Sequence, residues 1–532
     1  MKIKKDKLLV VENLSVKYAL NLKPTIKDFK IEIGKEEHLA LIGPSGCGKS
    51  TFAKTLVNML PVGAITQGYI SISGLDPRKI NKKEAQLFRR NNFGFIFQDS
   101  IKKLNPLMKV RDHLNELFKT HYQNKTVEQI DELVKETFRK VGIDFDRLDS
   151  FPHQFSGGMR QRVSIAMALA LKPKLLIADE PTTSLDTKTS FEIMKEILDL
   201  CKNFGTTLIL ISHDINLAAK LCKEVAIIEN GSIVEQGNIL DVLNSPKSNI
   251  GAKLVHASKI VLQPNTNYSS TNDVVLEVNN LRHWYKLNSS IFSTKWNKAL
   301  NEVSFKLYRN ETLGIVGSSG SGKSTLCRAL IGLQKVRGGE IKIYENNLQL
   351  KNNKSYEKFK NIQIVFQDPF SSLNPKMTIK NILKDIFFIQ KITDKKQIEK
   401  EIKLIFNNLK LPWSNQFLNS YPSQLSGGQL QRISLARALL LKPEILICDE
   451  SLNMLDAAVK IEILELLRLM QQKMNLTIIF ITHDLGIAKR FCNRLLVMNY
   501  GKIVDEGDSY TLFSKTKNIY TKSLIDSSLN IN

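Results

Sequence analysis

Two stretches of the chain have the residue types and spacing that bind nucleotide phosphates. GPSGCGKS at 43–50 and GSSGSGKS at 317–324 each follow a short apolar run and precede a helical pattern. Glycines let the backbone wrap around an anion, the amide N–H groups of the helix start face it, and a lysine neutralises its charge. We therefore expect these loops to hold ATP, with Lys49 and Lys323 on its phosphates. The predicted loops are Gly43, Pro44, Ser45, Gly46, Cys47, Gly48, Lys49, Ser50 and Thr51, and Gly317, Ser318, Ser319, Gly320, Ser321, Gly322, Lys323, Ser324 and Thr325.

Pairs of acids close two other apolar runs, KLLIADE and EILICDE. Mg²⁺ prefers oxygen ligands, so Asp179 and Asp449 are expected to bind it together with the hydroxyls of Ser50 and Ser324. The next residues, Glu180 and Glu450, lie where a strand alternates its faces and are predicted to activate the water that attacks the γ-phosphate. The alternative is that one acid of each pair is a solvated loop residue.

Polar residues also end neighbouring predicted strands. His213 and His483 are expected to contact the γ-phosphate and hold the attacking water, although an isolated histidine at such a place is more often structural. Gln98 and Gln367 end the runs FIFQ and IVFQ and offer both a donor and an acceptor to metal or water. These predictions complete an Mg²⁺ set of Ser50, Gln98, Asp179, Ser324, Gln367 and Asp449.

Tyr18 and Tyr285 end the first predicted strand of each half. An aromatic face at this place is expected to stack on adenine, and the alternative is packing in the core.

The chain is a tandem repeat, because these motifs recur in the same order 269 to 274 residues apart. A length of 532 residues also exceeds what one core supports. We expect a first domain over 8–255, a polar linker over 256–274 that contains QPNTNYSSTND, and a second domain over 275–525.

Each half is predicted to be an α/β domain of the P-loop NTPase type. Apolar runs such as HLALIG and TLILIS are typical of strands in a parallel sheet that is covered on both faces. Alternating runs such as GYISISG and GEIKIYE predict an antiparallel β subdomain beside it. Polar, amphipathic stretches at roughly 105–150 and 375–420 predict a helical subdomain.

The composition is that of a globular protein with a basic excess. The net charge is +24, from 76 basic and 52 acidic residues, which would suit nucleic acid or an anionic membrane surface. Lysines are spread along the whole chain, however, as a biased genome would produce. Six scattered cysteines form no CxxC pair and indicate neither zinc nor disulfides. No apolar run has the length of a transmembrane helix or signal peptide, so we expect a cytosolic chain.

The order of these motifs, with FSGGM at 155–159 and LSGGQ at 425–429, resembles the ATP-binding cassette (ABC) ATPases along nearly the whole chain. In that family the Ser-Gly-Gly turn opens a helix whose N-terminus caps the γ-phosphate of ATP on the opposite cassette. The resemblance implies two composite sites. One joins Lys49, Gln98, Asp179, Glu180 and His213 to Ser426, Gly427, Gly428 and Gln429, and the other joins Lys323, Gln367, Asp449, Glu450 and His483 to Ser156, Gly157, Gly158 and Met159.

Narrower strings, such as QDPFSSLNP and PHQFSGGMRQR, resemble the paired ATPase subunits of bacterial oligopeptide, dipeptide and nickel importers, here fused in one chain. Met in the first signature and Gln in the second match the usual order of those subunits. The first half departs from the pattern in QDSIKKLNP. The second departs in Ser451, which replaces a proline, and in NMLD, and these two features resemble nickel importers somewhat more than peptide importers.

The resemblance implies a peripheral motor on the cytoplasmic face of the cell membrane. Its partners would be two integral-membrane permease subunits and an extracellular or periplasmic substrate-binding protein, and its cargo peptides or nickel chelates. A soluble tandem-cassette ATPase acting on ribosomes or nucleic acid is the alternative, although its long charged linker is missing here. Export is a third possibility, but exporters usually fuse the cassette to a membrane domain.

Overall fold

The structure is a computed structural model that describes residues 7–19, 23–97, 103–182, 187–260, 273–287, 295–343, 346–347, 361–452, 455 and 457–529. Nearly all described residues up to Ser258 form one compact unit, and those from Lys259 onward form another. Helix α9 (Asn249–Ile260) runs into the segment that the sequence predicts as a linker, and β10 (Val274–Leu287) begins at its end. The middle of that segment, 261–272, lies outside the described residues.

The first unit, the first cassette, is built on a six-stranded sheet in the order β5-β6-β7-β3-β8-β9. Its strands are β3 (His38–Ile42), β5 (Phe93–Ile96), β6 (Leu175–Asp179), β7 (Thr207–Ser212), β8 (Glu224–Glu229) and β9 (Ser232–Asn238). All neighbours pair in parallel except β9, which is antiparallel to β8. The predicted parallel core is therefore confirmed.

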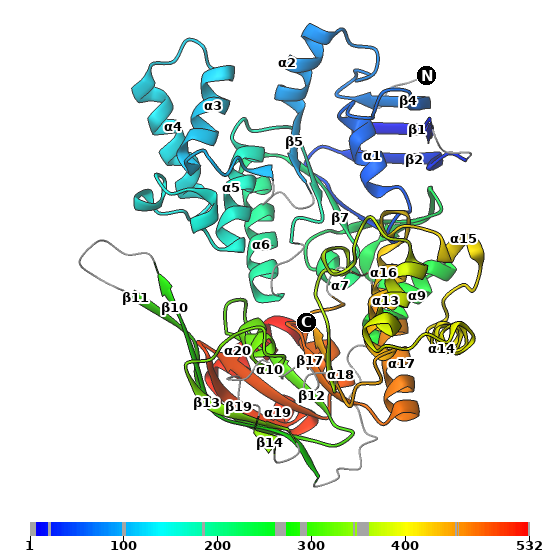
Figure 1. Cartoon of the computed structure of the whole chain (residues 1–532). Helices are drawn as coiled ribbons and strands as arrows, with labels where there is room; N and C mark the ends of the chain where they lie inside the picture. Colours follow the sequence, from blue (N-terminus) through cyan, green and yellow to red (C-terminus); the bar gives the residue numbers. More distant parts are fainter. Residues whose placement is uncertain are drawn as a thin grey trace. The chain divides into compact units, whose positions relative to one another are not determined.

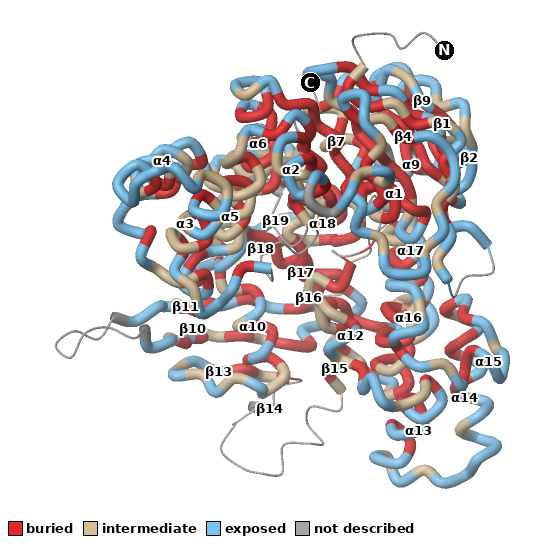
Figure 2. Tube along the Cα trace, turned by 90° about the horizontal axis from the view of Figure 1, so that it is seen from above, coloured by how far each residue is buried: buried red, intermediate tan, exposed pale blue. Residues whose placement is uncertain are grey.

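Both faces of this sheet are buried, which explains the continuous apolar runs. Leu39 and Leu41 of β3 belong to one core cluster, and the alternate residues Ala40 and Ile42 belong to another. Because successive side chains of a strand point to opposite faces, a strand between two cores must be apolar at every position. Figure 2 traces β7 in the colour of buried residues, in agreement with its fully buried residues.

One face packs on the antiparallel β subdomain, and the other packs on helices. The β subdomain is a three-stranded sheet of β2 (Ile26–Gly34), β1 (Lys7–Lys17) and β4 (Ile65–Ile72). In Figure 1 it lies beside α1 (Lys49–Leu56), while α3 (Val110–His121) and α4 (Val127–Lys140) stand together at the other end of the cassette. The remaining helices are α2 (Lys82–Asn92), α5 (Gly157–Leu169), α6 (Thr187–Phe204), α7 (Ile215–Ala219), α8 (Ile239–Asn244) and the short η2 (Phe145–Arg147) and η3 (Pro152–Gln154).

The second unit, the second cassette, repeats this plan. Its main sheet has the order β15-β16-β17-β12-β18-β19, and its antiparallel sheet the order β11-β10-β13-β14. The strands are β11 (Lys295–Tyr308), β12 (Thr312–Val316), β13 (Gly338–Ile343), β14 (Asn346–Asn347), β15 (Ile362–Val365), β16 (Ile445–Asp449), β17 (Thr477–Ile481), β18 (Arg494–Asn499) and β19 (Lys502–Asp508). The helices are α10 (Lys323–Leu330), α12 (Pro369–Ser372), α13 (Ile379–Ile389), α14 (Lys395–Asn408), α15 (Asn415–Leu418), η4 (Pro422–Gln424), α16 (Gly427–Leu439), α17 (Ala457–Met474), α18 (Leu485–Phe491), α19 (Ser509–Lys515) and α20 (Ile519–Leu529).

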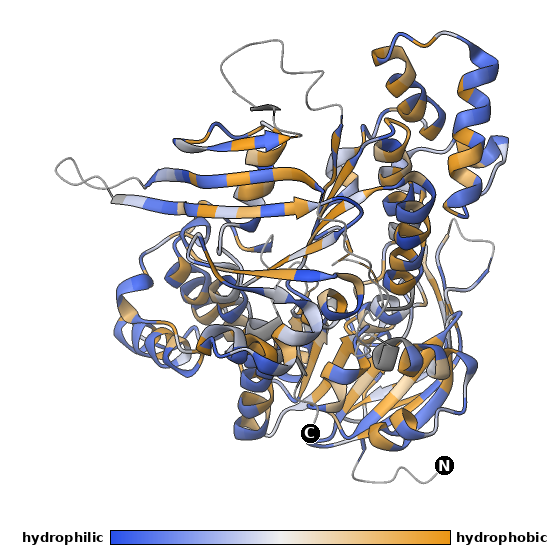
Figure 3. Cartoon of the chain, turned by 90° about the horizontal axis from the view of Figure 1, so that it is seen from below, coloured by the Kyte–Doolittle hydropathy of each residue, from blue (hydrophilic) through white to orange (hydrophobic). Residues whose placement is uncertain are grey.

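Several helices of both cassettes are amphipathic and bury one side, α4 and α13 among them. In α13, the residues Ile379, Ile382, Leu383, Ile386 and Phe387 are buried, at the spacing of one helical face. Figure 3 shows apolar residues concentrated on the strands and on one side of many helices. Among the helices that the structure describes, none combines the length and the apolar character needed to cross a bilayer.

Candidate active site

Each phosphate-binding loop joins a central strand to the helix that follows it. In the first cassette it connects β3 to α1, and in the second it connects β12 to α10. Gly48 and Gly322 cap these helices with φ of 110° and 107°, where a side chain would be strained. A Cβ on Gly322 would also lie 2.3 Å from the Ala299 carbonyl oxygen. The loop therefore requires glycine for its shape, as the motif indicated.

The loop lysines are buried and folded onto their own loops. Lys49 Nζ donates to the carbonyl oxygens of Gly43 at 2.7 Å and Pro44 at 2.9 Å. Lys323 Nζ donates to Gly317 at 2.8 Å and Ser318 at 2.9 Å. The same geometry in both copies holds each ammonium beside the N-terminus of a helix, where positive potential favours a phosphate.

The predicted metal-binding acids end the strands next to these loops. Asp179 closes β6 and is buried, and Asp449 closes β16 and is half-buried. Burial raises the pKa of Asp179, as does the nearby Glu180, whereas a hydrogen bond from Ser50 and the charge of Lys49 lower it. Burial together with Glu450 raises the pKa of Asp449 to about 6, against the opposing effect of Lys323.

Asp449 has a buried carboxylate oxygen that is available to coordinate a cation. Its Oδ1 is buried and has no hydrogen-bond partner in the part of the chain that the structure describes. A buried carboxylate oxygen without a partner is costly, and a bound Mg²⁺ would remove that cost. The described residues contain no group of three or more His, Cys, Asp or Glu side chains placed to hold a metal. A site with one carboxylate fits Mg²⁺, which keeps waters and phosphate oxygens among its ligands.

The predicted water-activating acids sit at a sharp backbone turn just after the strands. Glu180 and Glu450 have φ of 47° and 45°, in the left-handed region that disfavours a side chain. Each backbone N–H donates across the sheet at 3.0 Å, Glu180 to Ile211 and Glu450 to Ile481. Strained residues that are held by their surroundings in this way gather at functional sites. In this backbone conformation each carboxylate lies near the histidine that follows the adjacent strand.

The predicted histidines lie close to the carboxylates of Glu180 and Glu450. His213 Nδ1 lies 3.4 Å from Glu180 Oε1, and His483 Nδ1 lies 3.6 Å from Glu450 Oε1. In the second cassette Gln367 Nε2 also donates to Glu450 Oε2 at 3.1 Å, and Lys323 Nζ lies 3.9 Å from Glu450 Oε1. One carboxylate thus faces the lysine, the glutamine and the histidine that the sequence singled out. Gln98, the counterpart of Gln367, lies outside the described residues.

The two candidate adenine-stacking tyrosines have different surroundings. The Tyr18 hydroxyl lies 3.1 Å from Thr51 Oγ1, which places this ring beside the start of α1. The Tyr285 hydroxyl instead donates to Gln334 Oε1 at 3.2 Å, and 36% of the residue is exposed. Both rings lie near the surface, and only Tyr18 is tied to the phosphate-binding loop by a hydrogen bond among those described.

The Ser-Gly-Gly turns begin helices α5 and α16. Ser156 Oγ accepts from the N–H of Met159, and Ser426 Oγ accepts from the N–H of Gln429, each at 3.3 Å. The Gln429 side chain also returns to accept from the Ser426 N–H at 3.0 Å, which completes a capping box. Methionine cannot make that bond, and Met159 packs against the core of the first cassette instead. This local role was not among the sequence-based predictions, although Ser-x-x-Gln is the signature of a capping box.

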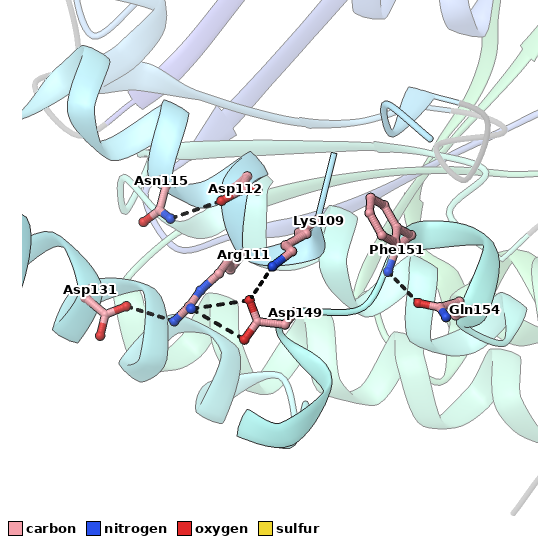
Figure 4. Close-up of polar contacts among 8 residues, drawn as sticks. All are labelled: Lys109, Arg111, Asp112, Asn115, Asp131, Asp149, Phe151 and Gln154. Atoms are coloured by element: carbon pink, nitrogen blue, oxygen red, sulfur yellow. Dashed lines mark hydrogen bonds and ion pairs between the residues drawn. The ribbon is translucent and has the colours of Figure 1, made fainter. Parts of the chain in front are cut away.

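A charged network fastens the segment that leads to the first turn (Figure 4). Asp149 accepts from Lys109 at 3.2 Å and from Arg111 at 3.4 Å, and Arg111 also donates to Asp131 at 3.0 Å. Just beyond, the Phe151 N–H donates to Gln154 Oε1 at 2.8 Å. The ion pairs join α3 and α4 to Asp149, and the Phe151–Gln154 bond closes η3, which ends two residues before Ser156.

Within each cassette the tertiary structure thus brings the loop lysine, the acid pair and the histidine together. These groups can bind phosphates at a helix N-terminus, hold a divalent cation at a buried carboxylate, and present a second carboxylate to a water. That combination is the chemistry of nucleoside triphosphate hydrolysis.

Comparison with known proteins points the same way. The ABC transporter family profile matches residues 26–183 and 300–453. The chain is 33% identical over 537 residues to the peptidoglycan transport ATP-binding protein YejF of Agrobacterium fabrum, covering 98% of this chain and 97% of that protein. It is 34% identical over 529 residues to an uncharacterized ABC transporter ATP-binding protein, YejF of Escherichia coli K12, covering 97% and 99%. It is 31% identical over 556 residues to the glutathione import ATP-binding protein GsiA of the same strain, covering 97% and 89%.

The resemblance extends through both cassettes and along nearly the whole chain. The chain therefore belongs to the ABC transporter family, as an ATPase that carries two ATP-binding cassettes in one polypeptide.

Proposed function

We propose that the chain is the ATP-hydrolysing motor of an importer for peptides or peptide-derived compounds. The observation that carries the proposal is that both cassettes keep the full set of loop lysine, buried aspartate, strained glutamate and histidine in one geometry. A motor with two competent cassettes fits the relatives, two of which bear names that specify peptidoglycan transport and glutathione import.

In this proposal each ATP lies between a phosphate-binding loop of one cassette and the Ser-Gly-Gly turn of the other. Lys49 and Lys323 neutralise the phosphates, and the N-termini of α16 and α5 cap the γ-phosphate of the opposite cassette. The predicted domains, 8–255 and 275–525 around the linker 256–274, are the two halves that close on ATP. The Met159 and Gln429 positions then lie in different sites, so the two sites differ in one contact residue.

In this proposal the carboxylates at the strand ends carry out the chemistry of hydrolysis. Glu180 and Glu450 accept the proton of the attacking water, and His213 and His483 orient the water and the γ-phosphate. Mg²⁺ would be held by Asp179 with Ser50 and Gln98, and by Asp449 with Ser324 and Gln367, and it would neutralise charge that develops on the phosphate oxygens. Loss of the products then allows the cassettes to separate.

The partners in this proposal are two permease subunits in the membrane and a substrate-binding protein outside it. The chain would act at the cytoplasmic face of the membrane, docked on the permease. The sequence features at Ser451 and NMLD that resemble nickel importers make chelated nickel the competing cargo. A ribosome-directed or nucleic-acid-directed ATPase remains the rival function, and the net charge of +24 is the feature that would suit it.

The test is growth rescue of a bacterial strain that lacks peptide and nickel uptake. The strain receives this chain with the permease and binding-protein genes that neighbour it, and it is grown separately on dipeptides, oligopeptides, glutathione and chelated nickel. We expect rescue on one or more peptide substrates. A matched strain that carries Glu180→Gln with Glu450→Gln should show none.

Rescue on nickel alone would assign the other cargo and overturn the peptide proposal. Absence of any rescue, with co-purification of the chain and ribosomes at moderate salt, would favour the rival function, because specific contacts survive salt that screens a general charge attraction.

A further inference from the structure

The second phosphate-binding loop is held by a residue from the far C-terminal helix. Tyr520 lies on α20, and its hydroxyl accepts a hydrogen bond from the Ser318 N–H at 3.0 Å. The same hydroxyl donates to Ser318 Oγ at 2.9 Å. Both residues are partly buried, so the pair is sheltered from competing water. A residue 202 positions away in sequence is thus tied to the loop by two hydrogen bonds.

Ser318 is also one of the two residues that hold the loop lysine. Its carbonyl oxygen accepts from Lys323 Nζ at 2.9 Å. The peptide units on both sides of this residue are therefore fixed, one by the tyrosine and one by the ammonium. Any change in the position of Ser318 changes where the lysine is held.

Tyr520 is itself fixed by the start of α20. The side chain of Asn518 accepts from the N–H groups of Tyr520 at 2.9 Å and Thr521 at 3.1 Å, and it donates to the Val504 carbonyl of β19 at 2.9 Å. Further along the helix, Leu524 and Ile525 pack against the core of the second cassette. The Tyr520 hydroxyl is therefore held in a fixed position beside the second phosphate-binding loop.

The first cassette lacks both partners of this contact. Pro44 stands where the second loop has Ser318, and a proline has no N–H to donate. The sequence Asn249-Ile250-Gly251 aligns with Asn518-Ile519-Tyr520, so Gly251 stands where the second cassette has its tyrosine. A Cβ at Gly251 would lie 2.6 Å from Glu235 Oε2 and 2.7 Å from Ser248 Oγ, so a side chain there would require these two side chains to shift.

The paired difference suggests two ways to restrict one loop position. In the first loop the proline ring fixes φ of residue 44 covalently. In the second loop Tyr520 restricts residue 318 through hydrogen bonds. A phosphate-binding loop does not need an N–H at the position of Ser318 to bind phosphate, because the first loop has a proline there. That N–H is therefore available to bond the tyrosine.

We propose that Tyr520 is a positioning residue for ATP at the second phosphate-binding loop, and that the first loop has no such dependence. Holding Ser318 lowers the conformational entropy that the loop loses when it binds phosphate, and this favours binding. The proposal goes beyond the motor function and does not depend on the cargo or the permease. It makes ATP affinity in one cassette depend on the docking of the C-terminal helix.

The test measures ATP affinity of the full chain by titration calorimetry, one loop at a time. Lys49→Ala disables the first loop, and Lys323→Ala disables the second. Tyr520→Phe keeps the ring but removes both hydrogen bonds. In the Lys49→Ala chain we expect it to raise the Kd for ATP by about 2- to 10-fold, the usual worth of a hydrogen bond. In the Lys323→Ala chain we expect less than about a 2-fold change.

Two further variants separate positioning from general damage. Tyr510→Phe makes the same change on α19, where the residue is 59% exposed, and should alter neither Kd. Ser318→Pro added to Tyr520→Phe copies the first loop and should restore the Kd to within about 2-fold of the Lys49→Ala parent, because the ring replaces the lost restriction.

Two results would overturn the proposal. One is an unchanged Kd for Tyr520→Phe in the Lys49→Ala chain. The other is an equal loss in both backgrounds, which would indicate a general loss of folding. Because neither measurement involves transport, failure of the importer proposal would leave this test unaffected.

Discussion

Gln367 donates a hydrogen bond to Glu450, with 3.1 Å between Nε2 and Oε2, and so connects the end of one strand to the strained turn after another. His483 approaches the other oxygen of the same carboxylate. In the general-base role that we propose for Glu450, the carboxylate must be held in place to accept a proton, and two neighbours on its two oxygens provide that restraint. The arrangement makes the function of this carboxylate testable residue by residue.

Replacing both glutamates should stop hydrolysis without stopping ATP binding. In Glu180→Gln with Glu450→Gln we expect the rate of phosphate release to fall by about 10²- to 10⁴-fold, because the water loses its base. ATP should remain bound, since the loop lysines and helix N-termini are unchanged. Glu116→Gln, an exposed substitution on α3, is the matched control. Full steady-state ATPase activity in the double variant would show that these acids are not the bases.

The role of Gln367 can be separated from that of its partner in a Glu180→Gln background. Gln367→Ala removes one hydrogen bond to Glu450 and should lower the remaining turnover by up to about 10-fold. Gln367→Glu keeps the size but brings a second negative charge to Glu450, so it should lower turnover at least as much. Phosphate release at saturating ATP measures both. Equal turnover in all three chains would mean that this contact does not position the base.

The exchange of Met159 and Gln429 should affect stability and the two sites differently. Gln429→Met removes the bond from the Ser426 N–H and should lower the free energy of unfolding by about 0.5 to 1.5 kcal/mol. Met159→Gln gains that bond but loses apolar contact, so its effect should be smaller. Denaturant unfolding measures both changes. If Gln429→Met and Met159→Gln, each assayed with one ATP site disabled, hydrolyse ATP at equal rates, the exchange does not affect hydrolysis.

The six cysteines should resist thiol reagents in the folded chain. All are buried. Burial raises the pKa values of Cys201, Cys222 and Cys448 to about 12, so these thiols stay protonated between pH 7 and pH 9. With Ellman's reagent at pH 8 we expect less than about one thiol per native chain to react within minutes. All six should react in 6 M guanidinium. Rapid reaction of several native thiols would contradict the buried placement.

Much of the site follows from local sequence. The loops, the acid pairs and the histidines were predicted because each is a short motif directly after an apolar strand, and parallel strands bring such ends to one edge of a sheet. The contact of His213 with Glu180, at 3.4 Å, is a consequence of β6 and β7 being neighbours. The pattern Ser-x-x-Gln also predicts the helix-capping role of Gln429, in addition to its resemblance to the family signature.

Other features depended on contacts between distant segments. The sequence treated Tyr18 and Tyr285 as equivalent, yet the structure bonds one to Thr51 and the other to Gln334. Tyr285 lies in β10 and Tyr18 follows β1, and each hydroxyl takes the partner that its own surroundings offer. Helix α9 likewise continues to Ile260, into a segment whose composition resembles a linker, and its residues Ile250, Leu254 and Val255, which pack against the cassette, come just before that segment.

By itself, the sequence determined that this protein is a duplicated ATPase, because its chemistry lies in short motifs whose spacing is set by single strand-to-helix connections. Only the tertiary structure decided which long-range contacts the two copies make differently. The bond between Tyr520 and Ser318 joins residues 202 positions apart, and it exists because α20 docks on the core of its own cassette. Such a contact depends on the packing of whole elements, which no local pattern encodes.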